Sequence, residues 1–137
     1  MLREARPGDL AACARIFLVV QPLAFPRRPV TSHEAADFEA ATREEELWVA
    51  EAARGIRGWV AIYRPDGFIH HLYVEPGFHR QGIGSALLRL ALRRCGGTGE
   101  LKSNEANRAA HAFYMASGWR PAGWGWAPSG PWIRFRY

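Results

Sequence analysis

The segment from Phe68 to Arg94 constrains the fold more than any other part of the chain. It opens with "FIHHLYV", an apolar run of strand length, and closes with "ALLRLALRR", whose apolar residues recur at helical spacing. Between them, "FHRQGIGS" places two glycines and no acidic residue where the strand gives way to the helix. The first backbone N–H groups of a helix have no partner inside it, and the helix dipole adds positive charge there. The pattern therefore favours an anion at this turn, although a tight turn without a ligand uses the same glycines.

The glycines and a neighbouring arginine suit a small ligand that carries phosphate. Gly82 and Gly84 let the backbone come close to a bulky phosphate, and Arg80 adds a positive side chain. The turn is not a dinucleotide fingerprint, because Leu87 stands where GxGxxG needs its third glycine. It is not a P-loop either, since the chain lacks the GxxxxGKS/T pattern.

The rest of the chain reads as one continuous series of elements, without repeats or linkers. Short connections join "ELWVAEAA", "IRGWVAIYR" and "FIHHLYVEP" into an antiparallel meander, and "LREAR", "ELKSN" and two strands around "PSGP" are the other strands. Helices are predicted after Asp9 until "QPLAFPRRP", from Thr31 or Ser32 to about residue 45, from about Gly82 to Arg94, and over "NRAAHAFYMASG". The order βααβββαβαββ predicts a single α/β (α+β) domain over residues 1–137, with a mostly antiparallel, twisted sheet of about seven strands flanked by about four helices.

Composition and charge exclude several classes of protein. The chain has 137 residues, 48% of them hydrophobic, which suits one packed core and is too apolar for a disordered chain. No apolar run reaches the length of a membrane span and "MLREARPGD" does not resemble a signal peptide, so we expect a cytoplasmic protein with no membrane partner. The net charge of +5 allows an anionic partner, but no basic run interleaved with aromatic residues indicates nucleic-acid binding. Cys13 and Cys95 have no metal-ligand spacing, which predicts reduced core thiols and no metal site.

A second group of polar residues lies on the late helical pattern "NRAAHAFY". Asn107 and Tyr114 are about two helical turns apart, so they share a helix face with His111 between them. The pattern therefore places an amide, an imidazole and a phenol in one stripe. From the residues alone, Asn107 as a helix cap and Tyr114 as a core aromatic fit equally well.

Together these stretches resemble the GNAT superfamily of N-acetyltransferases. The resemblance covers nearly the whole chain, through "LREARPGDL", "LYVEPGFHRQGIGSALL" and "NRAAHAFYMASGW". It implies acetyl-CoA as cosubstrate and an amine-bearing acceptor. The strand implied to bind the pantetheine arm through its main chain consists of Leu72, Tyr73 and Val74. The turn implied to bind the diphosphate consists of His79, Arg80, Gln81, Gly82, Ile83, Gly84 and Ser85.

The resemblance also implies roles for single groups. It places Asn107 on the pantetheine arm and Tyr114 near the thioester sulfur, where a phenol can protonate the leaving thiolate as general acid. The main-chain N–H of Val74 is expected to stabilise the oxyanion. One departure concerns His79, because the family usually has Gln or Arg three residues before the first glycine. Since the contact is mainly made by the backbone, we expect the site to survive this change.

His70 is the candidate general base. Related enzymes have bases on the corresponding strand face, and an imidazole can accept a proton directly or through water. Simple alternation would place Phe68, His70, Leu72 and Val74 on one face and Ile69, His71 and Tyr73 on the other. A structural histidine is the open alternative, and His71 and His111 are further candidates. The acidic run between residues 34 and 46 could attract a polyamine or an aminoglycoside, but it is interpreted as a solvated face.

The sequence leaves the acceptor open among small amines, amino acids and protein N-termini. The resemblance implies that the first two helices and the final hairpin line the acceptor side, and these segments carry Phe25, Arg27, Arg28, Trp124, Trp126 and Trp132. Tryptophans in a hairpin also suit a core or a dimer contact, so a homodimer is a further expectation. The alternative to an enzyme is a non-catalytic acyl-CoA-binding regulatory module.

Overall fold

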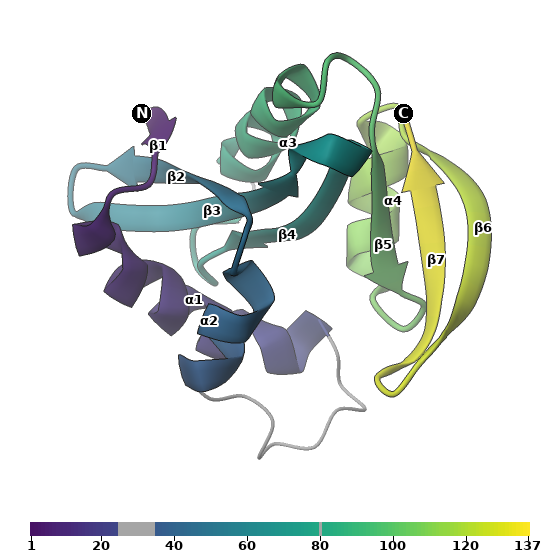
Figure 1. Cartoon of the computed structure of the whole chain (residues 1–137), viewed down its shortest axis with the longest axis horizontal. Coiled ribbons are helices and arrows are strands. Elements are labelled where there is room, and N and C mark those ends of the chain that lie inside the picture. The colour runs from purple at the N-terminus through teal and green to yellow at the C-terminus, as the bar shows by residue number, and fades with distance from the viewer. Residues whose placement is uncertain (25–34, 80) are drawn as a thin grey trace.

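The computed structural model describes residues 1–24, 35–79 and 81–137, and within them one seven-stranded sheet is flanked by four α-helices (Figure 1). The strands are β1 (Leu2–Glu4), β2 (Glu46–Ala52), β3 (Gly55–Tyr63), β4 (Phe68–Val74), β5 (Glu100–Asn104), β6 (Arg120–Ala127) and β7 (Gly130–Arg136). The helices are α1 (Leu10–Ala24), α2 (Ala35–Thr42), α3 (Ile83–Arg94) and α4 (Arg108–Ala116). This confirms the predicted order of elements. The sheet order is β1-β2-β3-β4-β5-β7-β6, and β4–β5 is its one parallel pair among the described strands, which confirms the mostly antiparallel sheet.

The two N-terminal helices differ from their predicted bounds. A break was expected within "QPLAFPRRP", but α1 continues through Pro22 to Ala24. Pro22 lies in the last turn, where its missing N–H removes one helical hydrogen bond and leaves the preceding turns intact. The second helix ends at Thr42 rather than near residue 45. Its expected caps, Thr31 and Ser32, lie outside the described residues.

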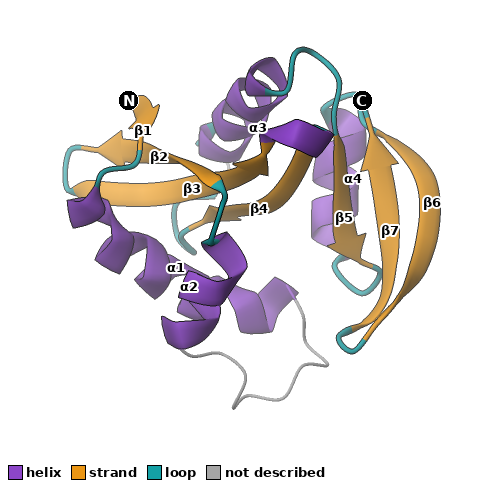
Figure 2. Cartoon of the chain, in the orientation of Figure 1, coloured by secondary structure: helices purple, strands orange, loops and turns teal. Residues whose placement is uncertain are grey.

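Two hydrophobic clusters fill the opposite faces of the sheet. In β3, Val60 and Ile62 belong to the cluster under α3, whereas Trp59 and Ala61 belong to the cluster under α1 and α2. Strict alternation along a strand produces this division. Figure 2 shows the resulting layers, with α1 and α2 on one side of the sheet and α3 and α4 on the other.

The centre of the sheet is open because β4 and β5 diverge. The two strands pair only at Phe68 with Glu100 and at Ile69 with Leu101. Beyond Leu101, β5 continues along β7 and β4 continues along β3. Figure 1 shows the two strands beginning side by side and then separating. The main chain of β4 after Ile69 therefore has no strand partner on its β5 side among the described residues.

The structure also bears on the expected state of the cysteines, on metal binding and on membrane spans. Cys13 and Cys95 are both free, as predicted, and burial raises the pKa of the Cys13 thiol to about 12. Among the described residues, no group of three or more His, Cys, Asp or Glu side chains is arranged to hold a metal ion. Within the same ranges, every helix is too short or too polar to cross a bilayer.

Candidate active site

A β-bulge in β4 lies at the point where β4 leaves β5. His71 pairs with Ala61 of β3 and Ile69 pairs with Ile62, which leaves His70 between them without a partner. A bulge of this kind adds one residue to a strand and changes which side chains share a face. It therefore sets the direction of the candidate base.

The predicted alternation along β4 is wrong because of this bulge. Ile69 and Leu72 both pack in the cluster under α3, whereas Tyr73 lies in the cluster under α1 and α2. His71 joins Tyr73 on the α1 side, where its ring lies 6.2 Å from that of Phe17. The face that carries Leu72 is thus the α3 and α4 side of the sheet, and the candidate base does not share it.

His70 lies on the α1 and α2 face, beside a buried carboxylate. Its ring is stacked on Tyr63, with an interplanar angle of 13°, and its centroid is 4.6 Å from that of Phe68. Its Nδ1 contacts the carboxylate of Glu45, which lies just before β2. The His70 side chain is 41% exposed and that of Glu45 only 3%. The Glu45 carboxylate thus contacts Nδ1 of His70, while the rest of the ring remains accessible to solvent.

Sequence reasoning missed Glu45, which belongs to the acidic run that was interpreted as a solvated face. Its burial depends on the contact with His70, which is 25 residues away in the chain. No local pattern reports such a contact. The next residue, Glu46, faces the other side of the sheet and bonds Arg94 of α3 at 2.6 Å.

Tyr114 lies on the opposite face of the sheet, at the same end of the β4–β5 opening. Its ring centroid is 5.5 Å from that of Phe135, which pairs with Leu101, the last β5 residue beside β4. Burial raises the pKa of the Tyr114 phenol to about 12, so the group holds its proton at neutral pH. Its hydroxyl makes no hydrogen bond within the described residues, which leaves the O–H free for a ligand.

The predicted polar stripe on α4 is only partly available. His111 hydrogen-bonds the carbonyl of Asn104 through Nε2 at 2.9 Å, so this ring is occupied. Asn107 is the N-cap of α4 and its side-chain oxygen accepts from the Ala110 N–H at 3.3 Å. Asn107 can cap the helix and also bind the pantetheine arm, because the cap uses its side-chain oxygen and leaves its amide N–H₂ group available.

The glycine turn presents main-chain donors at the start of α3. Gly82 is the N-cap with φ 80°, a left-handed conformation that favours glycine, and no side chain caps the helix. No acidic residue lies in the first turn, whose N–H groups belong to Ile83, Gly84 and Ser85. A Cβ atom on Gly82 would meet no atom within 4 Å, so the space beside the turn is open. These features fit a bound diphosphate.

The approach to this turn includes two further predicted residues and one that is outside the described chain. The His79 ring is bonded through Nε2 to the carbonyl of Val74 at 3.0 Å, so it closes the turn onto the end of β4. Gln81 is exposed beside it. Arg80 lies outside the described residues. The described residues of the predicted turn are therefore brought together with the end of β4.

Glycine at position 82 can be tested against a matched glycine at the other end of α3. Gly96 has φ 87° and, like Gly82, open space around its Cβ position. Alanine at either position should cost about 1 kcal/mol of unfolding free energy, because both demand a left-handed backbone. Only Gly82→Ala should also weaken coenzyme A binding, by about tenfold, since it strains the donors of the turn. Denaturant unfolding and calorimetry measure the two effects; equal losses of affinity in both variants would refute the assignment.

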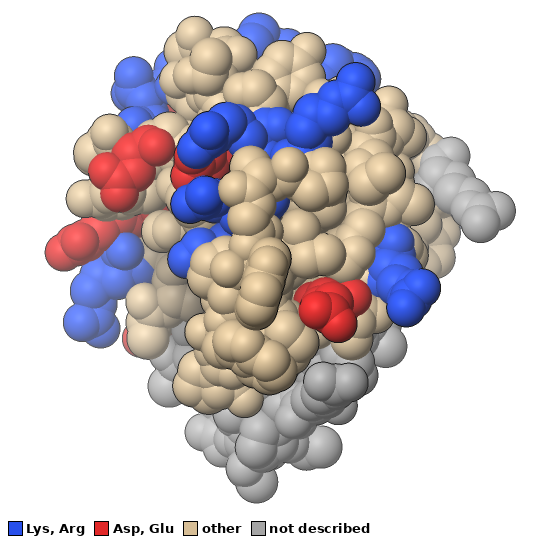
Figure 3. Space-filling model, turned by 90° about the vertical axis from the view of Figure 1, so that its right-hand side faces the viewer, with Lys and Arg blue, Asp and Glu red and all other residues tan. Residues whose placement is uncertain are grey.

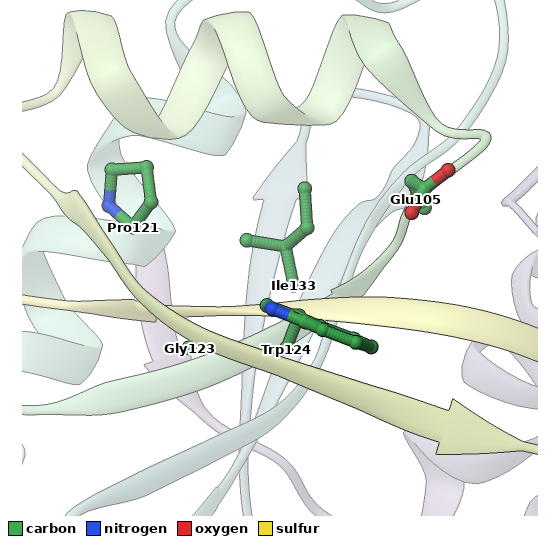
Figure 4. A pocket seen from close by; sticks show the side chains of 5 residues that line it. All are labelled: Glu105, Pro121, Gly123, Trp124 and Ile133. Carbon is green, nitrogen blue, oxygen red and sulfur yellow. The ribbon is translucent and has the colours of Figure 1, made fainter.

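The final hairpin carries exposed aromatic residues beside an open pocket. Trp124 and Trp126 on β6 are both 72% exposed, which excludes a core role for them. Figure 4 shows the pocket between α4 and the hairpin. The volume of this pocket is about 450 Å³. Its lining consists of Glu105, Pro121, Gly123, Trp124 and Ile133. On the face of the molecule seen in Figure 3, most Lys and Arg side chains gather in the upper half of the view.

The expected acceptor-side residues are divided by the fold. Trp132 packs over Gly125 and lies 4.3 Å from the ammonium of Lys102, on the other face of the hairpin from Trp124. Phe25, Arg27 and Arg28 lie outside the described residues. Of the hairpin tryptophans, Trp132 is therefore the one on the face that also carries His70.

Comparison with known proteins relates this geometry to one family. The family model described as "Acetyltransferase (GNAT) domain" matches residues 43–121, which include the bulge, the glycine turn and Tyr114. A search of curated protein sequences gave no significant match.

Solved structures share the fold over essentially the whole chain. Apo-form YjaB from Escherichia coli superposes with a TM-score of 0.83 at 19% identity, covering 100% of this chain and 96% of that one. A GCN5-related N-acetyltransferase from Rhodopseudomonas palustris gives 0.81 at 18% identity, covering 99% and 93%. A phosphinothricin acetyltransferase from Sinorhizobium meliloti, solved in complex with AcCoA, gives 0.77 at 20% identity, covering 100% and 86%.

Proposed function

Because the chain belongs to the GNAT acetyltransferase domain family, we propose that it is an N-acetyltransferase that moves an acetyl group from acetyl-CoA to an amine. One observation carries the proposal beyond family membership. The start of α3, whose first main-chain donors have no capping side chain in the described chain and no acid beside them, lies next to the part of β4 that β5 leaves, and this part leads toward Tyr114. A ligand with a diphosphate at one end and a thioester at the other fits such a path.

The main-chain groups would hold the cosubstrate. The N–H groups of Ile83, Gly84 and Ser85 would bind the diphosphate, assisted by the positive end of the helix dipole. Leu72 and Val74 would hydrogen-bond the pantetheine arm from the side of β4 that β5 leaves, and the Asn107 amide would donate to it. The main chain of Tyr73, the third predicted residue, is directed toward Trp59 of β3, because hydrogen-bonded pairs alternate along the ladder and Glu75 donates to the Arg57 carbonyl. The main-chain N–H of Val74, predicted to stabilise the oxyanion, lies at the glycine-turn end of β4, where His79 bonds the Val74 carbonyl, so it would serve the pantetheine arm rather than the thioester carbonyl.

The reaction needs a neutral amine and a proton for the departing thiolate. The amine nitrogen attacks the thioester carbon, the new C–N bond forms as the C–S bond breaks, and Tyr114 protonates the thiolate. Its pKa of about 12 is above that of an ordinary thiol, about 8.5, but a thiolate in the same desolvated site also becomes more basic. Tyr114 therefore acts as the acid on one face of the opening.

The more basic the acceptor amine is, the more the reaction needs a general base to remove its proton. An alkylamine with pKa about 10.4 must lose a proton at a cost of about 4.6 kcal/mol at neutral pH, whereas an α-amine near 7.8 needs only about 1 kcal/mol. His70 lies on the opposite face of the sheet from Tyr114, at the same end of the opening. This separation places the base on the acceptor side and the acid on the side of the leaving group.

The proposal is tested by a screen of amines with isotope-labelled acetyl-CoA, read by mass spectrometry of the amide products. The panel should include alkylamines, free amino acids and peptides with free N-termini. Labelled product from at least one class, absent with heat-denatured protein, is the expected result. Tight binding of acetyl-CoA by calorimetry with no product from any acceptor would instead identify a non-catalytic acyl-CoA-binding module.

A further inference from the structure

The environment of Glu45 indicates a role that extends the proposed function. Its side chain is 3% exposed, and its Oε1 contacts Nδ1 of His70. Its Oε2 has no hydrogen-bond partner, and no Lys or Arg forms an ion pair with it among the described residues. Buried carboxylates require hydrogen bonds or a nearby positive charge. Within the described chain, the group that supplies a hydrogen bond to the Glu45 carboxylate is His70.

We propose that Glu45 is a positioning residue that fixes the proton of His70 on Nδ1 and leaves Nε2 to accept a proton from the acceptor amine. An ionised carboxylate can only accept hydrogen bonds, so the ring nitrogen that faces it must carry the hydrogen. The neutral imidazole then has its lone pair on Nε2. The inference rests on the proposed function for the identity of the proton donor, but the tautomer itself does not depend on turnover.

The backbone around Glu45 supports a built arrangement. Glu44 has φ 71°, and it is the one non-glycine residue with positive φ in the described chain. Such a conformation costs roughly 1 kcal/mol or more and persists where the surroundings hold it. The strained residue immediately precedes Glu45, while Glu46 points to the opposite face and bonds Arg94. The turn thus separates two adjacent carboxylates, one to each side of the sheet.

The aromatic neighbours of His70 hold the ring plane. Tyr63 stacks parallel to the ring at a centroid distance of 6.1 Å, and Phe68 packs at 4.6 Å. With Nδ1 held by Glu45, these contacts fix the direction of Nε2. Because 41% of the His70 side chain is exposed, a ligand can approach the ring.

The proton balance of the step is complete without another reactant. Nε2 takes one proton from the amine as the C–N bond forms, and the Glu45 carboxylate stabilises the resulting imidazolium. The C–S bond breaks, and the thiolate takes the proton of Tyr114. His70 then returns its proton to solvent and solvent reprotonates Tyr114, so amine and thioester become amide and thiol.

The tautomer of His70 can be determined directly from long-range ¹H–¹⁵N spectra of the full chain, recorded at a pH where the ring is neutral. The signals of His70 are identified as those that disappear in the His70→Asn variant. The wild type should show the proton on Nδ1. Glu45→Gln should show the proton divided between Nδ1 and Nε2, because the Gln amide can either accept from an Nδ1–H or donate to a bare Nδ1. A wild-type ring with its proton on Nε2 would overturn the proposal without any variant.

Steady-state kinetics with an accepted amine provide the second readout. Glu45→Gln should lower kcat about 10²-fold and leave the KM for acetyl-CoA within about threefold, as expected when the base loses the carboxylate that fixes its tautomer and stabilises the imidazolium. The matched control is Glu46→Gln, which removes the adjacent carboxylate on the opposite face and should keep kcat within about threefold of wild type. A Glu45→Gln variant with the kcat of the control would refute the positioning role.

The two readouts distinguish this inference from the proposed function. The expected tautomer in a wild-type protein that acetylates no amine would disprove the acetyltransferase and leave the Glu45–His70 pair established. Turnover by a wild-type protein whose His70 carries its proton on Nε2 would refute the positioning role of Glu45 and leave the acetyltransferase established.

Discussion

Replacing Tyr114 with Phe is expected to lower kcat by about 10²- to 10³-fold and to leave coenzyme A affinity within about threefold. The phenyl ring keeps the packing against Phe113 and Phe135, and only the hydroxyl is lost. The proton for the departing thiolate would then have to come from water, which is less well positioned than the phenol to deliver it. Because coenzyme A binding does not use that proton, affinity and turnover should separate.

The fold should tolerate this substitution. The Tyr114 hydroxyl has no hydrogen-bond partner within the described residues, and its desolvation raises the pKa to about 12. Removing an unpartnered polar group should therefore change the unfolding free energy by no more than about 0.5 kcal/mol. Tyr137→Phe, at the half-exposed C-terminus, is the matched control and should keep full activity. If Tyr114→Phe keeps the kcat of this control, Tyr114 is a structural aromatic.

Replacing Ser85 with Glu should have opposite effects on stability and on coenzyme A binding. Ser85 lies in the first turn of α3, where a carboxylate interacts favourably with the helix dipole and should stabilise the free protein by about 0.5 kcal/mol. The same carboxylate would repel a diphosphate at this helix end. At about 5 Å and an effective dielectric constant of about 20, one pair of like charges costs about 3 kcal/mol, or roughly 10²-fold in affinity.

Ser85→Gln separates charge from size in this experiment. Gln has nearly the shape of Glu without its charge, so its affinity should stay within about threefold of wild type. Thermal unfolding without ligand and calorimetry with coenzyme A measure the two quantities. Equal affinities for the Glu and Gln variants would place the diphosphate elsewhere.

The main features of the fold could be predicted because they depend on local chemistry. Hydrophobic periodicity and glycine placement determine the elements, and the change from the β4 pattern to the α3 pattern across Gly82 is visible in the sequence alone. The N-cap role of Asn107 follows from its position before a helical run. Helix ends were harder to predict. A proline interrupts the interior of a helix, but Pro22 lies in the last turn of α1, where its missing N–H removes only one hydrogen bond.

The surroundings of His70 could not be predicted because they depend on contacts distant in sequence. The bulge at His70 arises from the register between β3 and β4, and nothing in "FIHHLYV" indicates an extra residue. The bulge moves Ile69 to the face of Leu72 and takes His70 away from it. The same holds for Glu45, whose burial next to His70 requires the sheet to be assembled first. A carboxylate in an acidic run gives no sign of such a partner.

The most direct test follows the backbone amides of ¹⁵N-labelled protein during titration with coenzyme A. The largest shifts should be those of Ile83, Gly84 and Ser85, together with the amides of β4 after Ile69, because these donors would bind the diphosphate and the pantetheine arm. Saturable binding that leaves the amides at the start of α3 unmoved would contradict the central claim, as would shifts confined to the pocket beside Trp124.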